Sequence, residues 1–253
     1  MMWGLEDKVV IITGGGKGIG CAYVKAFAEA GARVVIADID SSAAETLAVE
    51  LRQKGHRVLG RAVNVADFSN CQAMAKDVWD EWHGIHVLVN NAAIYSTLTR
   101  KSFTEISGDE WDQVMAVNLR GMLFCAQAVF PYMKQQKSGK IINISSSTIF
   151  KGSPYFLHYV TSKAGVVGFT RALAREVGEN GITVNTLAPG LTATGRNEQV
   201  SSAERFQNAM ADRCIKRVEI PEDLIGAVLF LASSHSDFIT GQLINVDGGS
   251  SMH

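Results

Sequence analysis

Short hydrophobic runs alternate with longer stretches of helical pattern from one end of the chain to the other. The runs are rich in Val and Ile and show little alternation with polar residues, as is typical of strands that are buried on both faces of a sheet. We therefore expect strands at Lys8–Thr13, Arg33–Ala37, Arg57–Val63, His86–Asn90, Lys140–Ser145, Thr183–Ala188 and Leu243–Val246.

Helical stretches separate these runs. A repetition of strand and helix with right-handed crossovers predicts a single-domain, Rossmann-like α/β fold, in which a doubly wound parallel sheet carries helices on both faces. The expected helices are Gly18–Ala30, Ser42–Lys54, Asp67–Trp82, Asp109–Gln136, Leu157–Glu179 and Pro221–Ala232.

Residues 191–217 depart from this rhythm, because they are polar and have little strand character. In a compact domain, such a stretch is more often a functional loop than a linker. We therefore expect one domain over residues 1–253, with a flap over the substrate at about residues 191–217. Its polar residues include Thr192, Thr194, Ser201, Ser202 and Asn208.

The composition excludes several classes of protein. The 253 residues are 47% hydrophobic and 19% charged, unlike a disordered chain or a coiled coil. With 24 basic and 25 acidic residues, the formal charge of −1 offers no basic field for nucleic acid or an anionic membrane. The four cysteines have no CxxC spacing and the histidines no ligand-like spacing, so we expect neither a disulfide framework nor a metal site.

The location of the protein follows from two further expectations. The N-terminus has no basic segment followed by an apolar stretch, so no signal peptide is expected. No run of about 18 apolar residues suggests a membrane span. We therefore expect a protein of the reducing cytoplasm.

A glycine-rich turn follows the first expected strand, at Thr13–Gly20 (TGGGKGIG). Glycines let the backbone turn sharply and approach a pyrophosphate, whose charge meets the N–H groups at the start of the next helix. The spacing of Gly14, Gly18 and Gly20 differs from GxGxxG, so a tight strand–helix turn is the alternative.

Asp38 favours NAD over NADP as the cofactor. It follows the second strand, about 20 residues after the glycine turn, where a carboxylate is expected to bind the ribose hydroxyls of NAD and to repel a 2′-phosphate. Lys17 acts in the opposite direction, because a cation in the turn could accept that phosphate. We expect NAD, with NADP as the less favoured alternative.

Tyr159 and Lys163 form a YxxxK pattern on an expected helix, with both side chains on one face. An ammonium close to a phenol is expected to lower the pKa of the phenol, which suits a general acid/base. Ser146 ends an expected strand, at the sheet edge where such folds bind ligands, and its hydroxyl could hold the substrate oxygen. The alternative is a Tyr–Lys pair on the surface of a helix.

Several further motifs accompany these residues along the chain. In order, the motifs are Thr13–Gly20, Asn90–Ala93, Asn118, Ser146, Tyr159–Lys163, Pro189–Gly190 and Val246–Gly249. Together they resemble the motifs of the short-chain dehydrogenases/reductases, in the same order and over essentially the whole chain. Local segments (NNAAIY, the Ser145–Thr148 run and GFTRALA) are similar to NAD-dependent secondary-alcohol dehydrogenases of the 1-phenylethanol dehydrogenase type.

The resemblance implies a role for each of four catalytic residues. Tyr159 would be the acid/base, and Lys163 would lower its pKa and bind the nicotinamide ribose. Ser146 would orient the carbonyl, and Asn118 would hold a water that relays protons. The implied cofactor-binding residues are Gly14, Lys17, Gly18, Ile19, Gly20, Asp38, Ile39, Asn64, Val65, Asn91, Ala92, Ala93, Tyr159, Lys163, Pro189, Gly190, Thr192 and Thr194.

The chain departs from the family pattern at three positions. Ala93 stands where the family usually has Gly, which places a methyl group near the cofactor. Asn64 stands where Asp is usual beside the adenine, and it keeps a hydrogen-bonding side chain. Thr192 stands where an aliphatic residue is usual, and nothing in the sequence explains this threonine.

The expected substrate-facing residues flank the catalytic positions in sequence. They are apolar or aromatic for the most part, with no obvious cation, which favours a small neutral hydrophobic alcohol or ketone. Core or interface packing is the alternative for each of them. The set is Ile94, Tyr95, Ser146, Ser147, Phe150, Tyr155 and Leu191.

The residues and the resemblance together are compatible with three functions. The leading hypothesis is an NAD-dependent oxidoreductase that interconverts a secondary alcohol and a ketone. The resemblance also implies a homotetramer paired through the helix Asp109–Gln136 and the YxxxK helix, and packing within one chain is the alternative for their apolar faces. The alternative function is a 3-oxoacyl thioester (acyl-carrier-protein) reductase that uses NADPH. A non-catalytic dinucleotide-sensing scaffold is disfavoured, because Tyr159 and Lys163 are both present.

Overall fold

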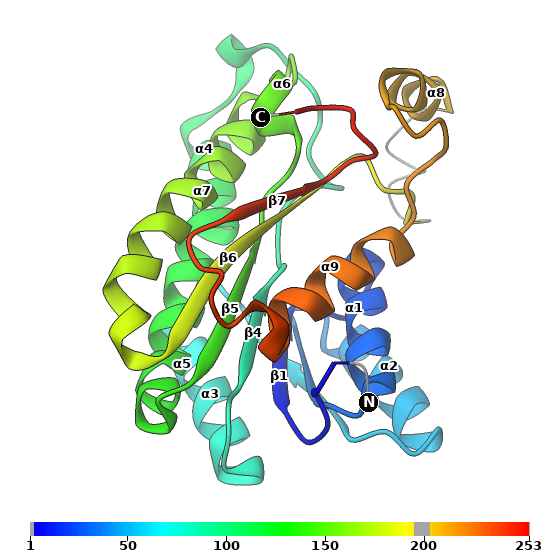
Figure 1. Cartoon of the computed structure of the whole chain (residues 1–253). Helices are drawn as coiled ribbons and strands as arrows, with labels where there is room; N and C mark the ends of the chain where they lie inside the picture. Colours follow the sequence, from blue (N-terminus) through cyan, green and yellow to red (C-terminus); the bar gives the residue numbers. More distant parts are fainter. Residues whose placement is uncertain (1–2, 195–202, 253) are drawn as a thin grey trace.

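The computed structural model describes residues 3–194 and 203–252, which form a seven-stranded parallel sheet between two layers of helices (Figure 1). The sheet order is β3-β2-β1-β4-β5-β6-β7. The predicted fold class is therefore confirmed. The strands are β1 (Val9–Thr13), β2 (Arg33–Asp38), β3 (Val58–Ala62), β4 (Val87–Asn90), β5 (Gly139–Ile144), β6 (Ile182–Pro189) and β7 (Leu243–Val246).

The helices divide between the two faces of the sheet. One layer holds α1 (Gly18–Glu29), α2 (Ser41–Gln53) and α9 (Glu222–Ala232). The other holds α3 (Phe68–Trp82), α5 (Gly121–Gln136) and α7 (Leu157–Val177), with α4 (Gly108–Met115) leading into α5. The shorter helices α6 (Thr148–Lys151) and α8 (Ala203–Asp212) lie near the carboxyl ends of the strands.

Successive residues of each strand belong to opposite faces of the sheet, so each face has its own hydrophobic core. In β1, Val10 and Ile12 face the α1 layer, whereas Val9 and Ile11 face the α3 layer. All four side chains are at most 1% exposed. This two-sided burial explains why the strands read as unbroken Val and Ile runs.

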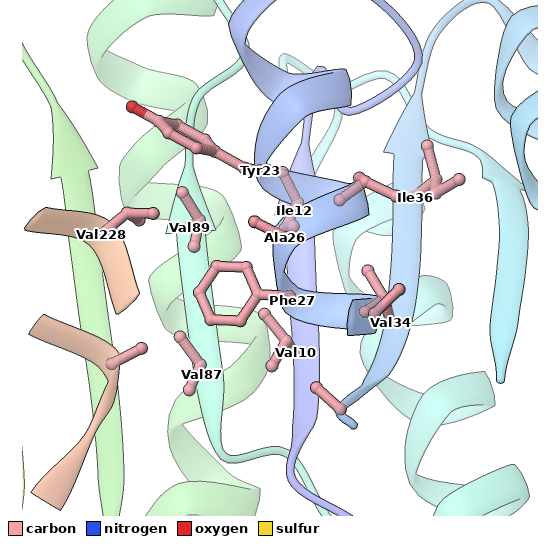
Figure 2. Packing of buried hydrophobic residues seen from close by; sticks show 14 of the residues in the cluster. Val10, Ile12, Tyr23, Ala26, Phe27, Val34, Ile36, Val87, Val89 and Val228 are labelled. Atoms are coloured by element: carbon pink, nitrogen blue, oxygen red, sulfur yellow. The ribbon is translucent and has the colours of Figure 1, made fainter. Parts of the chain in front are cut away.

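Phe27 lies at the centre of the core beneath α1. Figure 2 shows its ring among Val10, Val34 and Val87 of three neighbouring strands, and the side chain is fully buried. Such a residue stabilises the fold through apolar area removed from water and through close packing.

A chain of polar side chains crosses the other half of the sheet. Asn90 of β4 donates to Asn143 of β5 over 2.9 Å, and Asn143 donates to Thr170 of α7 over 2.9 Å. Thr186 of β6 donates to the same Thr170 hydroxyl over 2.8 Å. All four residues are at most 2% exposed, so these hydrogen bonds satisfy groups that water cannot reach.

The order of the strands places a crevice at the carboxyl ends of β1 and β4. The chain runs outward from β1 to β2 and β3, and then returns to the other side of β1 as β4. In open parallel sheets, ligands bind where the strand order reverses in this way.

The expected helix Asp109–Gln136 contains a feature that the periodicity did not predict. The structure has α4, a π-helical turn at Ala116–Arg120 and then α5, in one continuous helix. By length and composition, Gly108–Gln136 could cross a membrane, but here it contacts α3, β4 and β5 as part of a core layer. The π turn contains Asn118, and such turns are frequent at functional sites.

The expected flap at about residues 191–217 contains the helix α8, which the sequence pattern did not predict. Residues 195–202, including Ser201 and Ser202, lie outside the described residues. Glu204, Gln207 and Asn208 are exposed, which accounts for the polar sequence of this segment.

We expect Phe27→Ala to lower the free energy of unfolding by about 3–5 kcal/mol, because it leaves a cavity in a closely packed core. The matched control is Phe238→Ala, whose ring is 104% exposed and whose removal should change that free energy by less than about 0.5 kcal/mol. Urea unfolding followed by circular dichroism measures both. Equal effects of the two changes would contradict this assignment of the core.

Candidate functional site

A large cavity of about 1130 Å³ lies along the carboxyl ends of the strands. It exceeds the roughly 300–1,000 Å³ of pockets for drug-sized ligands. All the residues predicted to bind the cofactor line it, as do Ser146, Ile94, Tyr95 and Leu191. The residues that the sequence placed in different motifs thus meet in one place.

Three predicted substrate residues lie outside the described lining of this cavity: Ser147, Phe150 and Tyr155. The reason is that α6 redirects the chain directly after Ser146. The N–H of Ser147 donates to the carbonyl of Pro189 over 2.8 Å, and the side chain of Tyr155 is 64% exposed. Proximity to Ser146 in sequence was therefore a poor guide to contact with the cavity.

The glycine turn after β1 is held against the end of β4. Gly14 has a φ of +62°, and a Cβ there would lie 2.8 Å from the Cα of Ala92. The side-chain amide of Asn91 donates to the carbonyls of Thr13 and Gly14, each over 3.0 Å. Only glycine fits this close approach.

The same turn leads to the N-terminus of α1, which begins at Gly18 and faces the cavity. A Cβ on Gly20 would lie 2.1 Å from the carbonyl oxygen of Gly14, so the turn cannot carry a side chain there. A bare backbone before a helix N-terminus is the arrangement that binds a pyrophosphate. These residues therefore fit a dinucleotide.

Asp38 lines the cavity at the end of β2, where the ribose of a dinucleotide would be expected, and Asp40 lies two residues further along the chain. Asp38 accepts hydrogen bonds from the N–H groups of Gly16, over 2.9 Å, and Asp40, over 3.0 Å. The ammonium of Lys17 lies 2.5 Å from a carboxylate oxygen of Asp40. Lys17 is thus engaged by an acidic neighbour, and the two carboxylates outnumber it.

Tyr159 is 7% exposed, and its ring packs against two other aromatic rings. The ring centroids of Tyr95 and Phe156 lie 5.2 Å and 4.8 Å from that of Tyr159. Burial raises the pKa of Tyr159, and Tyr95 raises it further, while the neighbouring Ser146 hydroxyl acts in the opposite direction. The Ser146 and Tyr159 hydroxyls therefore adjoin each other inside the cavity.

Lys163 lies beneath Tyr159, with its Nζ 5.9 Å from the Tyr159 ring centroid. Its Nζ donates to the carbonyl of Ile144 over 2.8 Å, and burial lowers the pKa of the ammonium to about 8. The sequence-based expectation that Lys163 lowers the pKa of Tyr159 differs from the net result here. The desolvation of a buried phenolate is the dominant effect and acts in the other direction.

Asn118 is fully buried in the π-helical turn and lies behind the cavity wall. Its Oδ1 accepts from the N–H of Ile94 over 2.7 Å, and its Nδ2 donates to the carbonyl of Ile94 over 3.2 Å and to Ser162 over 3.1 Å. The side chain thus connects the segment after β4 to α7, next to Lys163. Both amide hydrogens are used, which leaves only oxygen lone pairs for the water that the resemblance implies.

The sequence reasoning missed a buried ion pair that holds the segment after β6. Glu219 accepts hydrogen bonds from the N–H of Gly190 over 3.1 Å, from Thr192 over 2.8 Å and from Arg213 over 3.1 Å. Arg213 also donates to the carbonyl of Leu191 over 2.8 Å. This explains the Thr at position 192, whose hydroxyl binds a carboxylate inside the protein. Burial raises the pKa of Glu219.

The sequence reasoning also missed three charged residues of the cavity. Lys101, Glu110 and Arg205 line the cavity. Lys101 pairs with Glu110 over 2.6 Å, and Nε2 of the buried His158 lies 3.1 Å from the other oxygen of that carboxylate. These residues come from a loop and from helices, where the hydrophobic pattern does not show which side chains face a cavity. Within residues 3–194 and 203–252, no group of three or more His, Cys, Asp or Glu residues could hold a metal ion.

Comparison with known proteins gives matches along nearly the whole chain. A family model described as enoyl-(acyl carrier protein) reductase matches residues 14–251. A probable galactose dehydrogenase of Rhizobium meliloti is 38% identical, over 97% of this chain and 95% of that protein. A (2S)-[(R)-hydroxy(phenyl)methyl]succinyl-CoA dehydrogenase subunit of Thauera aromatica is 37% identical over 98% of each chain. A 3-oxoacyl-[acyl-carrier-protein] reductase of Thermotoga maritima is 37% identical, over 97% of this chain and 98% of that protein.

The lowered pKa of Lys163 predicts a pH dependence of stability. Between about 8 and the ordinary 10.5, the unfolded chain binds this proton more tightly than the folded chain, so the free energy of unfolding rises with pH across that window. The full effect is on the order of 3 kcal/mol.

Lys163→Met should remove this contribution. The unfolding free energy of the original protein minus that of the variant should therefore increase from pH 8 to 10.5. Urea unfolding at several pH values measures it, and the comparison cancels the other groups that titrate there. Parallel curves for the two proteins would show that Lys163 keeps an ordinary pKa.

Proposed function

The chain belongs to the short-chain dehydrogenase/reductase superfamily, and on that premise we propose that it is an NAD-dependent enzyme that interconverts a secondary alcohol and a ketone. The superfamily assignment makes it an oxidoreductase that acts on CH–OH groups and uses NAD(P)(H). The cofactor preference, the residue roles and the substrate class are our proposals.

The adjoining hydroxyls of Tyr159 and Ser146, buried above Lys163 at the carboxyl end of β5, are the observation that carries the proposal. Reduction of a ketone adds a hydride to its carbon and a proton to its oxygen. When bound, a nicotinamide dinucleotide supplies that hydride, or accepts one in the reverse direction. Tyr159 donates the proton, and Ser146 donates a hydrogen bond that orients the same oxygen.

Burial holds the phenol of Tyr159 in the protonated form, which is the form that ketone reduction requires, and it opposes the phenolate that alcohol oxidation requires. Lys163 titrates at about pH 8, so it can exchange a proton under ordinary conditions. Its position between Tyr159 and the carbonyl of Ile144 supports a role in returning the proton to Tyr159. Asn118 is proposed to hold the segment beside Lys163 in place.

The preference for NAD rests on the acidic pair at the end of β2. Asp38 is oriented by the Gly16 and Asp40 N–H groups, and its charge would repel a 2′-phosphate. Lys17 could oppose this, but its ammonium is paired with Asp40. Ile39 is 74% exposed and brings no charge to the same place. The glycine turn and α1 would hold the pyrophosphate.

The walls next to Tyr159 favour an apolar group beside the reacting carbon. Ile94, Tyr95 and Leu191 line the cavity there, and the rings of Tyr95 and Phe156 surround the phenol. The local likeness to 1-phenylethanol dehydrogenases supports aryl ketones as test substrates.

We also propose a homotetramer, because Leu123 of α5 and Leu157 of α7 are 39% and 48% exposed on the helices expected to pair.

A 3-oxoacyl thioester reductase that uses NADPH is the second candidate. It is favoured by the Thermotoga maritima relative, whose name describes a 3-oxoacyl-[acyl-carrier-protein] reductase. The carboxylates of Asp38 and Asp40 near Lys17 disfavour NADPH, the cofactor of this second candidate.

Replacement of Tyr159 tests the acid/base role. We expect Tyr159→Phe to lower kcat by about 10²–10⁴-fold or more, since one positioned acid/base contributes that much, and to leave NADH binding within about twofold. Steady-state kinetics and fluorescence titration of NADH measure the two quantities. The matched control is Tyr132→Phe, whose ring stacks on Trp79 outside the cavity. Full activity of Tyr159→Phe would refute the role.

The cofactor and substrate class are tested by oxidation of NADH and NADPH against acetophenone, a cyclic ketone, a 1,2-diketone and an acetoacetyl thioester. We expect NADH to be preferred at least about tenfold, which is about 1.4 kcal/mol. Asp38→Ala should reduce that preference, whereas Asp80→Ala, which removes an exposed carboxylate paired with Lys76, should retain it. A tenfold preference for NADPH with the thioester would establish the second candidate instead.

A further inference from the structure

The ion pair of Arg213 and Glu219 lies inside the protein, behind the wall of the cavity. Among the ion pairs of residues 3–194 and 203–252, it is the one whose two side chains are both buried, at 3% and 5% exposure. Two charges taken out of water lose hydration that their attraction recovers only in part, so apolar side chains of similar volume often stabilise a fold as well. Stability alone therefore does not account for this pair, and the groups that it binds indicate its role.

Those groups belong to the three residues directly after β6. The carboxylate of Glu219 accepts hydrogen bonds from the N–H of Gly190, over 3.1 Å, and from the hydroxyl of Thr192, over 2.8 Å. The guanidinium of Arg213 donates to the carbonyl of Leu191 over 2.8 Å. One carboxylate and one guanidinium thus bind three consecutive residues, which fixes the direction of the backbone between them.

The ion pair fits so closely behind this segment that position 190 requires glycine. A Cβ on Gly190 would lie 2.4 Å from a carboxylate oxygen of Glu219 and 3.1 Å from a guanidinium nitrogen of Arg213. The guanidinium is itself anchored, because it also donates to the carbonyls of Asp247, over 3.1 Å, and Arg217, over 3.0 Å. The pair therefore holds residues 190–192 against a support that is fixed from behind.

The same segment forms the part of the cavity wall that connects the glycine turn with the reacting groups. At one end, the carbonyl of Pro189 accepts from the N–H of Ser147, next to Ser146, over 2.8 Å. At the other end, Thr194 lies 3.8 Å from the position of a Cβ on Gly18, in the glycine turn. A dinucleotide that reaches from this turn to the reacting groups therefore lies along the segment. The lining residues of the segment are Pro189, Gly190, Leu191, Thr192 and Thr194.

We propose that Arg213 and Glu219 are positioning residues for the cofactor, because they fix the wall at residues 190–192 that the nicotinamide end of the dinucleotide contacts. The proposal rests on the proposed function, which places a dinucleotide in this cavity, and it adds two residues that lie outside the described lining. Backbone N–H and C=O groups that are fixed in advance bind a polar ligand without the entropic cost of ordering a loop. The ion pair provides that order at the nicotinamide end, as the glycine turn does at the pyrophosphate.

A comparison of NADH with ADP-ribose separates this role from general destabilisation, because ADP-ribose has the adenosine, the phosphates and the second ribose of NADH but no nicotinamide ring. The double variant Arg213→Met/Glu219→Met removes both charges together and leaves neither one buried and unpaired. We expect it to weaken NADH binding at least about tenfold and to change ADP-ribose binding by less than about twofold, since only the contacts of the ring depend on the pair. Isothermal titration calorimetry measures both affinities.

Glu219→Gln is the second variant, and it decides the point if the double variant does not fold. The amide keeps one oxygen acceptor but presents N–H groups where the carboxylate has its second oxygen, so we expect NADH binding to weaken about threefold to tenfold. The matched control is Arg217→Gln in the same segment, where Arg217 pairs with Asp223 over 2.5 Å and is 56% exposed. This change should leave both affinities within about twofold. Circular dichroism and thermal unfolding establish that each variant is folded.

An unchanged NADH affinity in the folded variants, or equal losses of NADH and ADP-ribose affinity, would overturn the proposal and leave the proposed function intact. Because the titrations measure binding, a failure to reduce any ketone counts against the proposed function alone. NADPH and 2′-phospho-ADP-ribose are titrated in parallel, so the role of the ion pair is decided even if the protein prefers NADPH. A protein that binds neither dinucleotide would refute both the proposed function and this inference.

Discussion

The close contact between the turn after β1 and the end of β4 is the constraint on which the candidate site depends. The backbone of Gly14 approaches Ala92 so closely that a Cβ would lie 2.8 Å from its Cα, and Asn91 holds the turn through two hydrogen bonds. Because β1 and β4 are adjacent strands that lie far apart in sequence, this contact exists only once the sheet has formed. The phosphate-binding turn is therefore a product of the complete fold, and a side chain at Gly14 would displace both segments at once.

The sheet edge then brings two environments together in one cavity. The cofactor region is made of bare backbone, a helix N-terminus and the acidic end of β2, and its shape follows from strand order. The reacting region is buried and aromatic, so desolvation dominates the titration of Tyr159 and Lys163. Desolvation moves the two pKa values apart, so near neutral pH the phenol stays protonated while the amine can exchange a proton.

The sequence predicted the parts of the fold and site that follow from strand periodicity. Every expected strand and long helix is present within two residues, and the motifs that end strands line the cavity, because parallel strands bring their carboxyl ends to one edge. Features set by spatial partners were missed. Thr192 binds Glu219, which lies 27 positions away, and the π turn at Asn118 adds a residue that periodicity does not reveal. Arg205 was missed because the local pattern does not show which side of α8 faces the cavity.

The polar chain from Asn90 through Asn143 and Thr170 to Thr186 has a consequence for strand alignment. Runs of Val and Ile are nearly interchangeable, so apolar packing alone distinguishes poorly between neighbouring registers of parallel strands. A shift of one strand would leave buried amide and hydroxyl groups without partners, at a cost of about 1–3 kcal/mol for each group. These four side chains therefore specify how far β4, β5 and β6 extend relative to one another. The accuracy with which Ser146 meets Tyr159 depends on hydrogen bonds made deep in the apolar interior.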